Sequence, residues 1–306
     1  MAIYYYTNTS PGAPTLTGAA GSLITLLDWL LVTNLGWTKE FSGTNLASYR
    51  AATGNRFYLG VDDTTTLYSR VRGFETMTAA GVAVASGTGP FPTDAQLSGG
   101  KYVRKADVAG AARQWRFISN GRMFYLSSNL VDPSNANTEY NLTMFGDIES
   151  FKSADVFNTV LSANRDSTGN TGCMASSYLS TAFSYPAYLA RSYTQAGGST
   201  SGTRLVVNPY SNYSSTEIGS NASIAYPSPV LGGLHMDKVY VADGIYPSTT
   251  HIRGVYPGMY FPLHARPLEN ESTFHGNGEF SGRTFVVWNV GSGGQIFIEN
   301  TGGWGE

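Results

Sequence analysis

The chain repeats one short pattern of turn and strand residues four times. In each case a small turn residue and a polar residue precede a run of aromatic and β-branched residues, in the segments NRFYLGV, GRMFYL, GRTFVVW and GQIFIEN, which start at Asn55, Gly121, Gly282 and Gly294. Glycine and asparagine favour turns, whereas aromatic and β-branched residues favour strands. Each segment therefore predicts a turn followed by the return strand of a β-hairpin. Their irregular spacing argues against a solenoid or propeller.

The segment from Gln114 to Leu126 is the clearest hairpin, because Asn120-Gly121 is the strongest signal for a two-residue type I′ turn. A second hairpin is expected over residues 49–59, with its turn at residues 53–55. A third is expected near the end of the chain, where residues 284–290 and 295–299 flank the glycine-rich residues 291–294.

One helix is expected. Leucines recur at spacings of three and four between Leu23 and Leu31, Ser22 is a suitable N-cap, and Asn34 and Gly36 can end the helix. Because this segment is apolar on more than one side, we expect the helix to lie between a sheet and a second layer.

These signals predict a mainly β fold with two β-rich lobes built from hairpins or sandwiches, one N-terminal helix and long Gly/Ser/Thr/Asn loops. We expect an extended arm over residues 1–20, a helix and β-rich domain over residues 21–164, and a loop-rich β domain with a C-terminal hairpin and tail over residues 165–306. The alternative is one continuous domain in which the last hairpins complete the first sheet, because chain termini often lie close together.

The composition favours a protein that contacts other chains. Charged residues make up only 13%, against about 25% in an average soluble domain, and there are 20 tyrosines, a residue enriched at interfaces. A net charge of −2 without a basic tract gives no electrostatic basis for binding nucleic acid. The longest apolar stretch, residues 23–32, is shorter than the ~20 residues that cross a bilayer, and the chain start does not resemble a signal peptide. We expect neither nucleic acid nor membrane as a partner.

The sequence offers little catalytic chemistry. Cys173 is the only cysteine, and the four histidines lack the i, i+2 or i, i+4 spacing of metal ligands, so no cofactor or metal is expected. Asp147 and Glu149 could form a carboxylate pair of the kind that glycosidases use. A solvated strand face explains the two carboxylates better, and the chain is not expected to be an enzyme.

Several segments are candidate contacts between chains. The stretch from Arg253 to Pro267 is rich in tyrosine, proline and arginine, which suits either an interface or a pair of core strands. We expect the N-terminal arm from Ile3 to Tyr6, the loops over residues 165–225 and the C-terminal tail to join neighbouring chains. The predicted assembly contacts are Tyr4, Tyr5, Tyr6, Arg253, Tyr256, Tyr260, Arg266 and Trp304.

The chain resembles structural proteins encoded in the virion gene blocks of tailed bacteriophages. The resemblance lies in the opening MAIYYYTNTSPGAPTLTGAAGSLITLLDWLL, in residues 36–45 and 55–63, in the Ala190-Arg-Ser-Tyr segment, and in Ile252-Arg-Gly-Val-Tyr-Pro-Gly and Pro262-Leu-His-Ala-Arg-Pro267. It implies a component of the virion, in the tail, baseplate or neck, and it carries over no catalytic residues.

We therefore expect a structural subunit of a tailed-phage virion, assembled in the bacterial cytoplasm through arms, loops and edge strands. Its partners would be copies of itself and other virion proteins. The alternative is a receptor- or glycan-binding protein at the tail tip or on the particle surface, in which aromatic rings on long loops stack on a host glycan.

Overall fold

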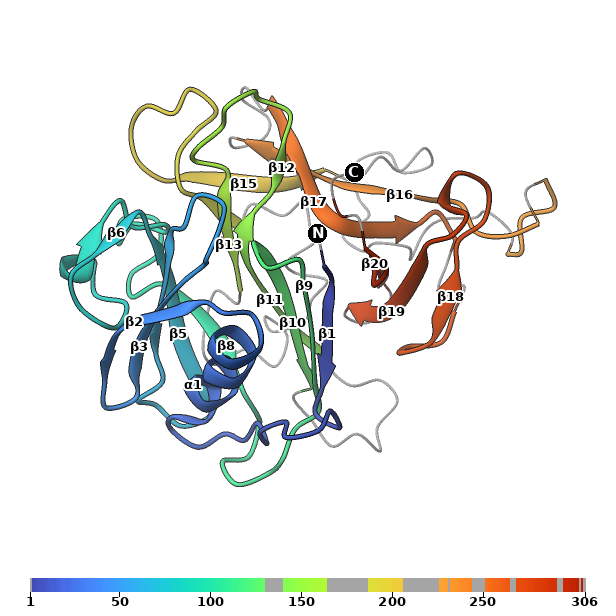
Figure 1. Cartoon of the computed structure of the whole chain (residues 1–306). Coiled ribbons are helices and arrows are strands. Elements are labelled where there is room, and N and C mark those ends of the chain that lie inside the picture. The colour runs from blue at the N-terminus through green and yellow to red at the C-terminus, as the bar shows by residue number, and fades with distance from the viewer. Residues whose placement is uncertain are drawn as a thin grey trace.

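The computed structural model describes residues 2–129, 140–163, 187–205, 226–230, 232–243, 251–264, 268–290, 294–302 and 304. Within these residues the chain is mainly β with one short α-helix near the N-terminus, which confirms the predicted fold class (Figure 1). No helix in this part of the chain is long and apolar enough to cross a membrane.

The strands form one small sheet, one large sheet and a two-stranded ribbon, all antiparallel. The small sheet has the order β2 (Thr38–Gly43), β3 (Leu46–Arg50), β4 (Tyr58–Asp62), β5 (Tyr68–Phe74) and β8 (Lys101–Arg104). The ribbon pairs β6 (Thr76–Met77) with β7 (Gly87–Thr88), and a 3₁₀ turn, η2 (Val84–Ser86), precedes β7. Together with the helix, these elements make the N-terminal lobe.

The large sheet contains strands from both ends of the chain. Its order is β1 (Tyr4–Thr7), β9 (Trp115–Ser119), β10 (Met123–Asn129), β11 (Tyr140–Asp147), β13 (Thr159–Ser162), β14 (Ala187–Leu189), β15 (Thr200–Leu205), β16 (Met236–Asp243), β17 (His251–Pro262), β20 (Gly294–Glu299), β19 (Thr284–Val290) and β18 (Thr273–His275). The short strand β12 (Glu149–Ser150) pairs with β17 beside this path, and a 3₁₀ turn, η3 (Gly278–Phe280), lies between β18 and β19.

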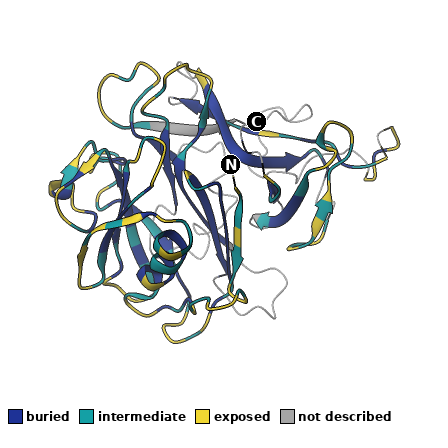
Figure 2. Cartoon of the chain, viewed as in Figure 1, coloured by how far each residue is buried: buried dark blue, intermediate teal, exposed yellow. Residues whose placement is uncertain are grey.

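Strands β9, β10, β11 and β13 form a middle layer that is buried on both faces. One face packs on the N-terminal lobe through residues such as Phe117 and Phe124. Alternate residues, such as Ile118 and Tyr125, pack on the inner faces of β16, β17, β19 and β20. Figure 2 shows this central layer as the most deeply buried part of the fold.

The burial of this layer explains the repeated sequence pattern. Every residue of β10 is buried, and strands covered on both faces read as continuous apolar runs rather than alternating ones. The four repeated segments lead into β4, β10, β19 and β20, so each one does supply the return strand of a hairpin.

The turn between β9 and β10 differs from the predicted type. A type I′ turn needs positive φ at both central residues, but here Gly121 has φ +86° and Asn120 is not in the left-handed region. Instead, the Asn120 carboxamide oxygen accepts hydrogen bonds from the backbone N–H groups of Arg122 (3.0 Å) and Met123 (2.8 Å). The side chain of asparagine therefore closes the turn.

The helix is present, but its start was predicted wrongly. An α-helix, α1 (Ser22–Leu27), continues into a π-helical segment, η1 (Asp28–Asn34), and both pack between the small sheet and the middle layer as expected. Gly21, with φ +80°, occupies the N-cap position, and the Ser22 hydroxyl instead accepts a hydrogen bond from the backbone N–H of Thr17. The capping group is the Asp63 carboxylate, which accepts from the backbone N–H groups of Leu23 and Ile24.

The pairing of the strands crosses residue 165, where two domains were expected to meet. Strands β9 to β13 belong to the same sheet as β14 to β20, so the large sheet unites the middle of the chain with its C-terminal half. Both ends of the chain also pack against the same apolar cluster, which includes Trp304 and is contacted by Ile3.

The predicted arm and loops fall partly inside this sheet. The N-terminal segment pairs with β9 of its own chain as β1, an edge strand. Residues 200–203, which the sequence analysis placed in a loop, start strand β15. Most of the other predicted contact loops, residues 164–186 and 206–225, lie outside the described residues, as does Cys173.

Candidate functional site

Strand β17 carries an irregular bulge at the motif Tyr256-Pro257-Gly258-Met259. Opposite this motif β16 has the single residue Val239, since Tyr240 pairs with Val255 and Lys238 pairs with Tyr260. A bulge of this kind bends a strand and redirects its side chains, and bulges are frequent next to functional sites. Here the bulge opens a pocket between β17 and the C-terminal hairpin.

Gly258 and Trp304 hold the bulge in place. Gly258 has φ +64°, and a Cβ atom built there would lie 2.2 Å from the indole Nε1 of Trp304. That indole donates a hydrogen bond to the Glu299 carbonyl (2.8 Å) and packs on the ring of Tyr125. The Tyr125 hydroxyl in turn donates to the Pro257 carbonyl (2.8 Å). Residue 258 must therefore be glycine both for its backbone conformation and for the indole.

Gly258→Ala should destabilise the protein and displace Trp304. The left-handed backbone alone costs about 1–2 kcal/mol for a residue with a side chain, and the clash with the indole adds to this. Thermal unfolding and tryptophan emission measure the two effects. The matched control is Gly36→Ala, since Gly36 has φ +68° with open space around its Cβ position. Equal loss of stability in both variants would contradict the role given to Trp304.

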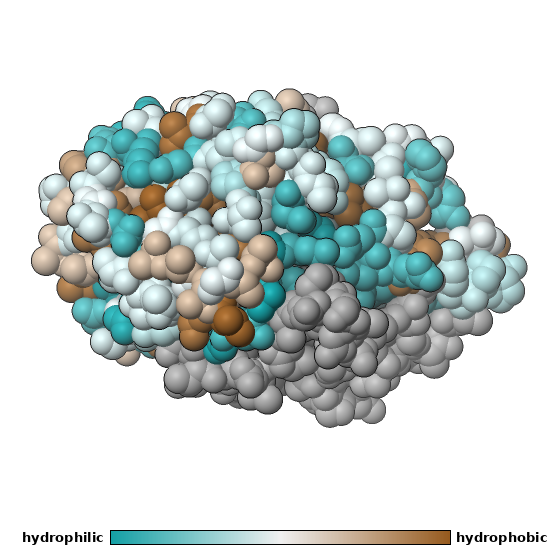
Figure 3. Space-filling view, turned by 90° about the horizontal axis from the view of Figure 1, so that it is seen from below, coloured by the Kyte–Doolittle hydropathy of each residue, from teal (hydrophilic) through white to brown (hydrophobic). Residues whose placement is uncertain are grey.

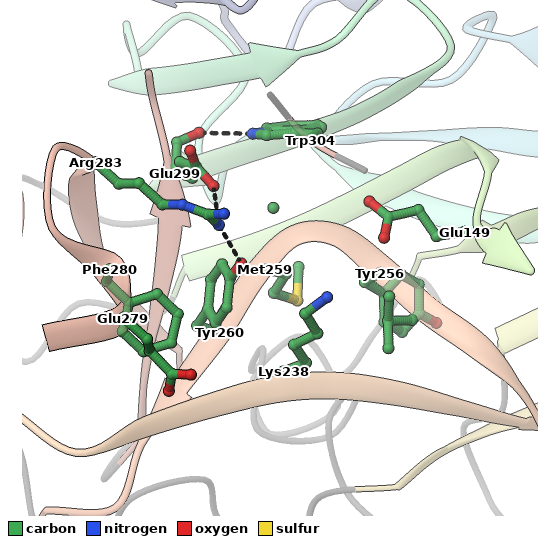
Figure 4. A pocket seen from close by; sticks show the side chains of 12 residues that line it. Glu149, Lys238, Tyr256, Met259, Tyr260, Glu279, Phe280, Arg283, Glu299 and Trp304 are labelled. Carbon is green, nitrogen blue, oxygen red and sulfur yellow. Dashed lines mark hydrogen bonds and ion pairs between the residues drawn. The ribbon is translucent and has the colours of Figure 1, made fainter. Parts of the chain in front are cut away.

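The pocket beside the bulge has a volume of about 280 Å³ and a strongly charged wall (Figure 4). Figure 4 shows Glu149 on one side, facing Arg283 and Glu299 on the other, with the Lys238 ammonium between them. Arg283 donates to Glu299 (3.3 Å) and to the Tyr260 hydroxyl (3.1 Å). The other lining residues are Val255, Tyr256, Gly258, Met259, Glu279, Phe280 and Trp304.

Two carboxyl groups of this pocket have altered acidity. Burial raises the pKa of the Glu149 carboxyl, although Lys238 and Arg283 oppose the rise. Burial also raises the pKa of Glu299, and the nearby charge of Glu149 adds to it, while Arg283 and Thr301 act in the opposite direction. A half-buried titratable group in a cleft is a candidate functional residue.

A second feature lies at the start of β17, where exposed aromatic and aliphatic side chains surround a shallow hollow of about 270 Å³. Phe151 is 62% exposed, Ile252 51% and Tyr193 41%. The rings of Tyr193 and His251 lie 4.5 Å apart. Isolated exposed apolar residues are ordinary, but several around one hollow make it a candidate interaction surface. The hollow is lined by Phe151, Lys152, Tyr193, His251, Ile252 and Arg253.

Arg253 lies beneath the hollow and fixes its shape. Its guanidinium forms two hydrogen bonds to the Asp155 carboxylate (2.6 and 2.8 Å) and one to Asp243 (2.9 Å). Asp243 also accepts from the backbone N–H of Tyr193, and the backbone N–H of Phe151 donates to the Arg253 carbonyl. One buried arginine thus links three segments around the hollow. They are the segment with Phe151 and Asp155, the segment with Tyr193, and the end of β16 at Asp243.

A projecting apolar turn lies at the other end of the β16–β17 pair. We call it the knob and define it as Tyr226, Pro227, Pro229 and Val230, all exposed, with Val230 93% exposed. Two backbone hydrogen bonds join Ser228 to Gly232 and Gly233 and close the turn. Because Met236, which follows the knob, pairs with Pro262, the knob lies at the far end of β17 from the hollow (Figure 1).

On the face shown in Figure 3, hydrophobic residues lie as separate spots among polar ones over the described part of the chain. The hollow and the knob differ from these separate spots because each gathers several exposed apolar side chains.

The predicted assembly contacts differ in how exposed their side chains are in the structure. Tyr5 is 36% exposed on the edge strand β1, with Tyr4 and Tyr6 half-buried beside it. The side chains of Arg253, Tyr256, Tyr260 and Trp304 are buried within the described part of the chain, so their contact with other chains stays a prediction. Arg266 lies outside the described residues.

The carboxylate pair considered from the sequence is also separated. The Asp147 carboxylate turns toward the N-terminal lobe, where it accepts hydrogen bonds from the Asn55 backbone N–H (2.8 Å) and the Thr159 hydroxyl (2.6 Å). Glu149 instead faces the pocket with Glu299, a residue 150 positions later that sequence spacing could not connect with it. Among the described residues no group of three His, Cys, Asp or Glu side chains is arranged to hold a metal ion.

No protein-family model matches the chain, and no curated protein matches it.

Proposed function

We propose that this chain is a structural subunit of a tailed-bacteriophage virion that assembles with copies of itself head to tail. The observation that carries the proposal is that one chain presents an apolar hollow and an apolar knob at opposite ends of strands β16 and β17. The resemblance of the sequence to virion proteins and its low share of charged residues support the same role.

The two surfaces are different, so the contact between copies is heterologous. Such contacts repeat around a ring when the rotation between subunits closes, and they otherwise give an open helical stack. Rings and stacks are the forms of a tail, baseplate or neck. The hollow offers aromatic faces from Phe151 and Tyr193, and the knob offers a valine and two prolines that can enter it.

The head-to-tail contact predicts a specific behaviour of two single variants. Ile252→Asp spoils the hollow and leaves the knob intact, whereas Val230→Asp spoils the knob and leaves the hollow intact. Each variant alone should be monomeric under conditions in which the wild-type chain forms larger species, because a buried unpaired carboxylate opposes the contact. An equimolar mixture should form a dimer and nothing larger. Sedimentation velocity measures the size of the wild-type chain, of each single variant and of their mixture.

Val108→Asp is the matched control, because Val108 is 57% exposed and belongs to neither surface. This variant should assemble like the wild type. A mixture of the two single variants that stays monomeric would show that the knob does not enter the hollow. A wild-type chain absent from particles purified on a density gradient would overturn the virion role itself.

Deletion of the N-terminal arm is a poor test of assembly. Residues 4–7 form β1, which completes the large sheet beside β9, so their removal exposes a core strand of the same chain. A defect caused by that deletion would not separate folding from association. The two aspartate variants act on exposed side chains and leave the sheet intact.

The glycan-binding alternative is kept as a second candidate function. The observation that favours it is the charged pocket at the β17 bulge, which is separate from both proposed assembly surfaces.

A further inference from the structure

The pocket at the β17 bulge contains two charged side chains, Glu149 and Lys238, that form no ion pair among the described residues. No described residue donates a hydrogen bond to the Glu149 carboxylate, and Glu149 forms no ion pair within the described part of the chain. The Lys238 ammonium, which shares the pocket and interacts electrostatically with Glu149, also forms no ion pair among these residues. Because Glu149 and Lys238 share the pocket without forming an ion pair, a ligand has room to bind between these opposite charges.

The arrangement of charges restricts what that ligand can be. A cation would be attracted by the carboxylates of Glu149, Glu279 and Glu299 but repelled by Lys238 and Arg283, and an anion would be attracted by the two cations but repelled by the three carboxylates. A hydroxyl group suits both sides, because it donates one hydrogen bond and accepts two. Adjacent hydroxyls on one ring could donate to Glu149 and accept from Lys238 and Arg283. Hydrogen bonds to charged groups are also stronger than those between neutral groups.

The size and the apolar part of the wall narrow the choice further. Ligand pockets for drug-sized molecules have volumes of roughly 300–1,000 Å³, and this one, at about 280 Å³, suits a single ring. Phe280, half-buried on η3, adds an aromatic ring to the wall. The C–H face of a sugar ring packs well on such a surface.

We propose that this pocket binds one saccharide ring, whose adjacent hydroxyls bridge Glu149 and the cations Lys238 and Arg283. The inference rests on the glycan-binding candidate and names its site, and it does not require assembly through the hollow and the knob. Glu149 is the hydrogen-bond acceptor, and Lys238 and Arg283 are the donors.

If Glu149 serves ligand binding and not stability, its replacement should not lower the thermal stability of the protein. Burial raises the pKa of Glu149, so folding disfavours its ionised form relative to the unfolded chain. A raised carboxyl pKa contributes stability only at low pH, and this contribution is lost as the pH rises through the folded-state pKa. Glu149→Gln should therefore leave the thermal midpoint at pH 7 equal to or above that of the wild type, while it removes the acceptor.

The test is a titration with the methyl glycosides of glucose, galactose and N-acetylglucosamine, followed by saturation-transfer NMR, with glycerol as a non-ring polyol. At least one glycoside should bind the wild-type chain with a Kd on the order of 1 mM. Glu149→Gln and Lys238→Met should each weaken binding at least tenfold. Glu269→Gln, an exposed glutamate outside the pocket, is the matched control and should bind like the wild type.

The absence of binding by any of the three glycosides would overturn the proposal, as would binding that Glu149→Gln and Lys238→Met leave unchanged. The assembly proposal is tested separately, because Val230→Asp and Ile252→Asp should bind the glycoside normally while they fail to associate. Adsorption of the labelled Glu149→Gln chain to host cells tests glycan binding at any other site, so its outcome is distinct from that of the pocket.

Discussion

Asp63→Ala should lower the free energy of unfolding by about 3–5 kcal/mol, the range found when one partner of a buried ion pair is removed. Both Asp63 and its partner Lys105 have fully buried side chains. The alanine variant leaves the Lys105 ammonium in the core with only the carbonyl oxygens of Ala19 and Thr65 as acceptors. Chemical denaturation measures the loss.

Asp63 also joins elements that are far apart in the sequence. Its carboxylate accepts from the first backbone N–H groups of α1 and from the Ser69 hydroxyl (2.6 Å) on β5. Loss of a helix cap alone costs about 0.5–2 kcal/mol. The single substitution therefore removes the cap, the ion pair and a link between the helix and the small sheet together.

The neighbouring aspartate provides the control. Among the described residues, the Asp62 carboxylate accepts only from the backbone N–H and the hydroxyl of Thr64, at the surface. Asp62→Ala should cost about 1 kcal/mol or less. A double variant, Asp63→Ala with Lys105→Met, should be more stable than the sum of the two single effects predicts, because it removes both buried charges. Additive effects would contradict the ion pair as the main source of stability.

The sequence was sufficient for the hairpins because their signals are local. A turn residue followed by an apolar run predicts a return strand, and the segments that begin at Gly121 and Gly294 do form such strands. The same local logic failed at the start of the helix. Ser22 is the best cap in its neighbourhood, but the group that caps the helix is Asp63, which lies 40 residues from Leu23 and is brought there by the pairing of β3, β4 and β5.

The candidate sites were harder to predict for the same reason. The Tyr-Pro-Gly motif after Arg253 suggested an interface, because tyrosine and arginine are frequent there. In the structure that motif is a bulge whose tyrosine, Tyr256, is buried, and the residues that face solvent nearby are Phe151, Tyr193 and Ile252. Composition alone does not tell which member of a strand is exposed. That depends on bulges and on which neighbouring strand covers each face.

Arg253→Met should also cost about 3–5 kcal/mol, because it leaves Asp155 and Asp243 buried without their cation. The loss should reach the hollow as well. Arg253 positions the segments that carry Phe151 and Tyr193, so the variant should associate more weakly than its remaining folded fraction explains. Denaturation gives the stability, and sedimentation of the folded protein gives the association.

The effect of pH gives this prediction a further test. Burial would raise the pKa of the Asp155 carboxyl, but hydrogen bonds from Arg253 and Ser150 outweigh burial and hold that pKa below its usual value. A lowered carboxyl pKa contributes stability above the unfolded-state value of about 3.9, and this contribution is lost as the pH falls through the folded-state pKa. The gap in stability between wild type and Arg253→Met should therefore narrow below about pH 4.

Arg50→Met is the control substitution. Arg50 pairs with Glu40 at 3.5 Å on the surface, where both side chains are about one-third exposed, and such pairs contribute about 0–1 kcal/mol. The triple variant Arg253→Met, Asp155→Asn, Asp243→Asn should recover part of the lost stability, since it no longer buries unpaired charge. If it were no more stable than Arg253→Met, the loss would come from packing of the arginine side chain, and the charge network would not be what holds the three segments together.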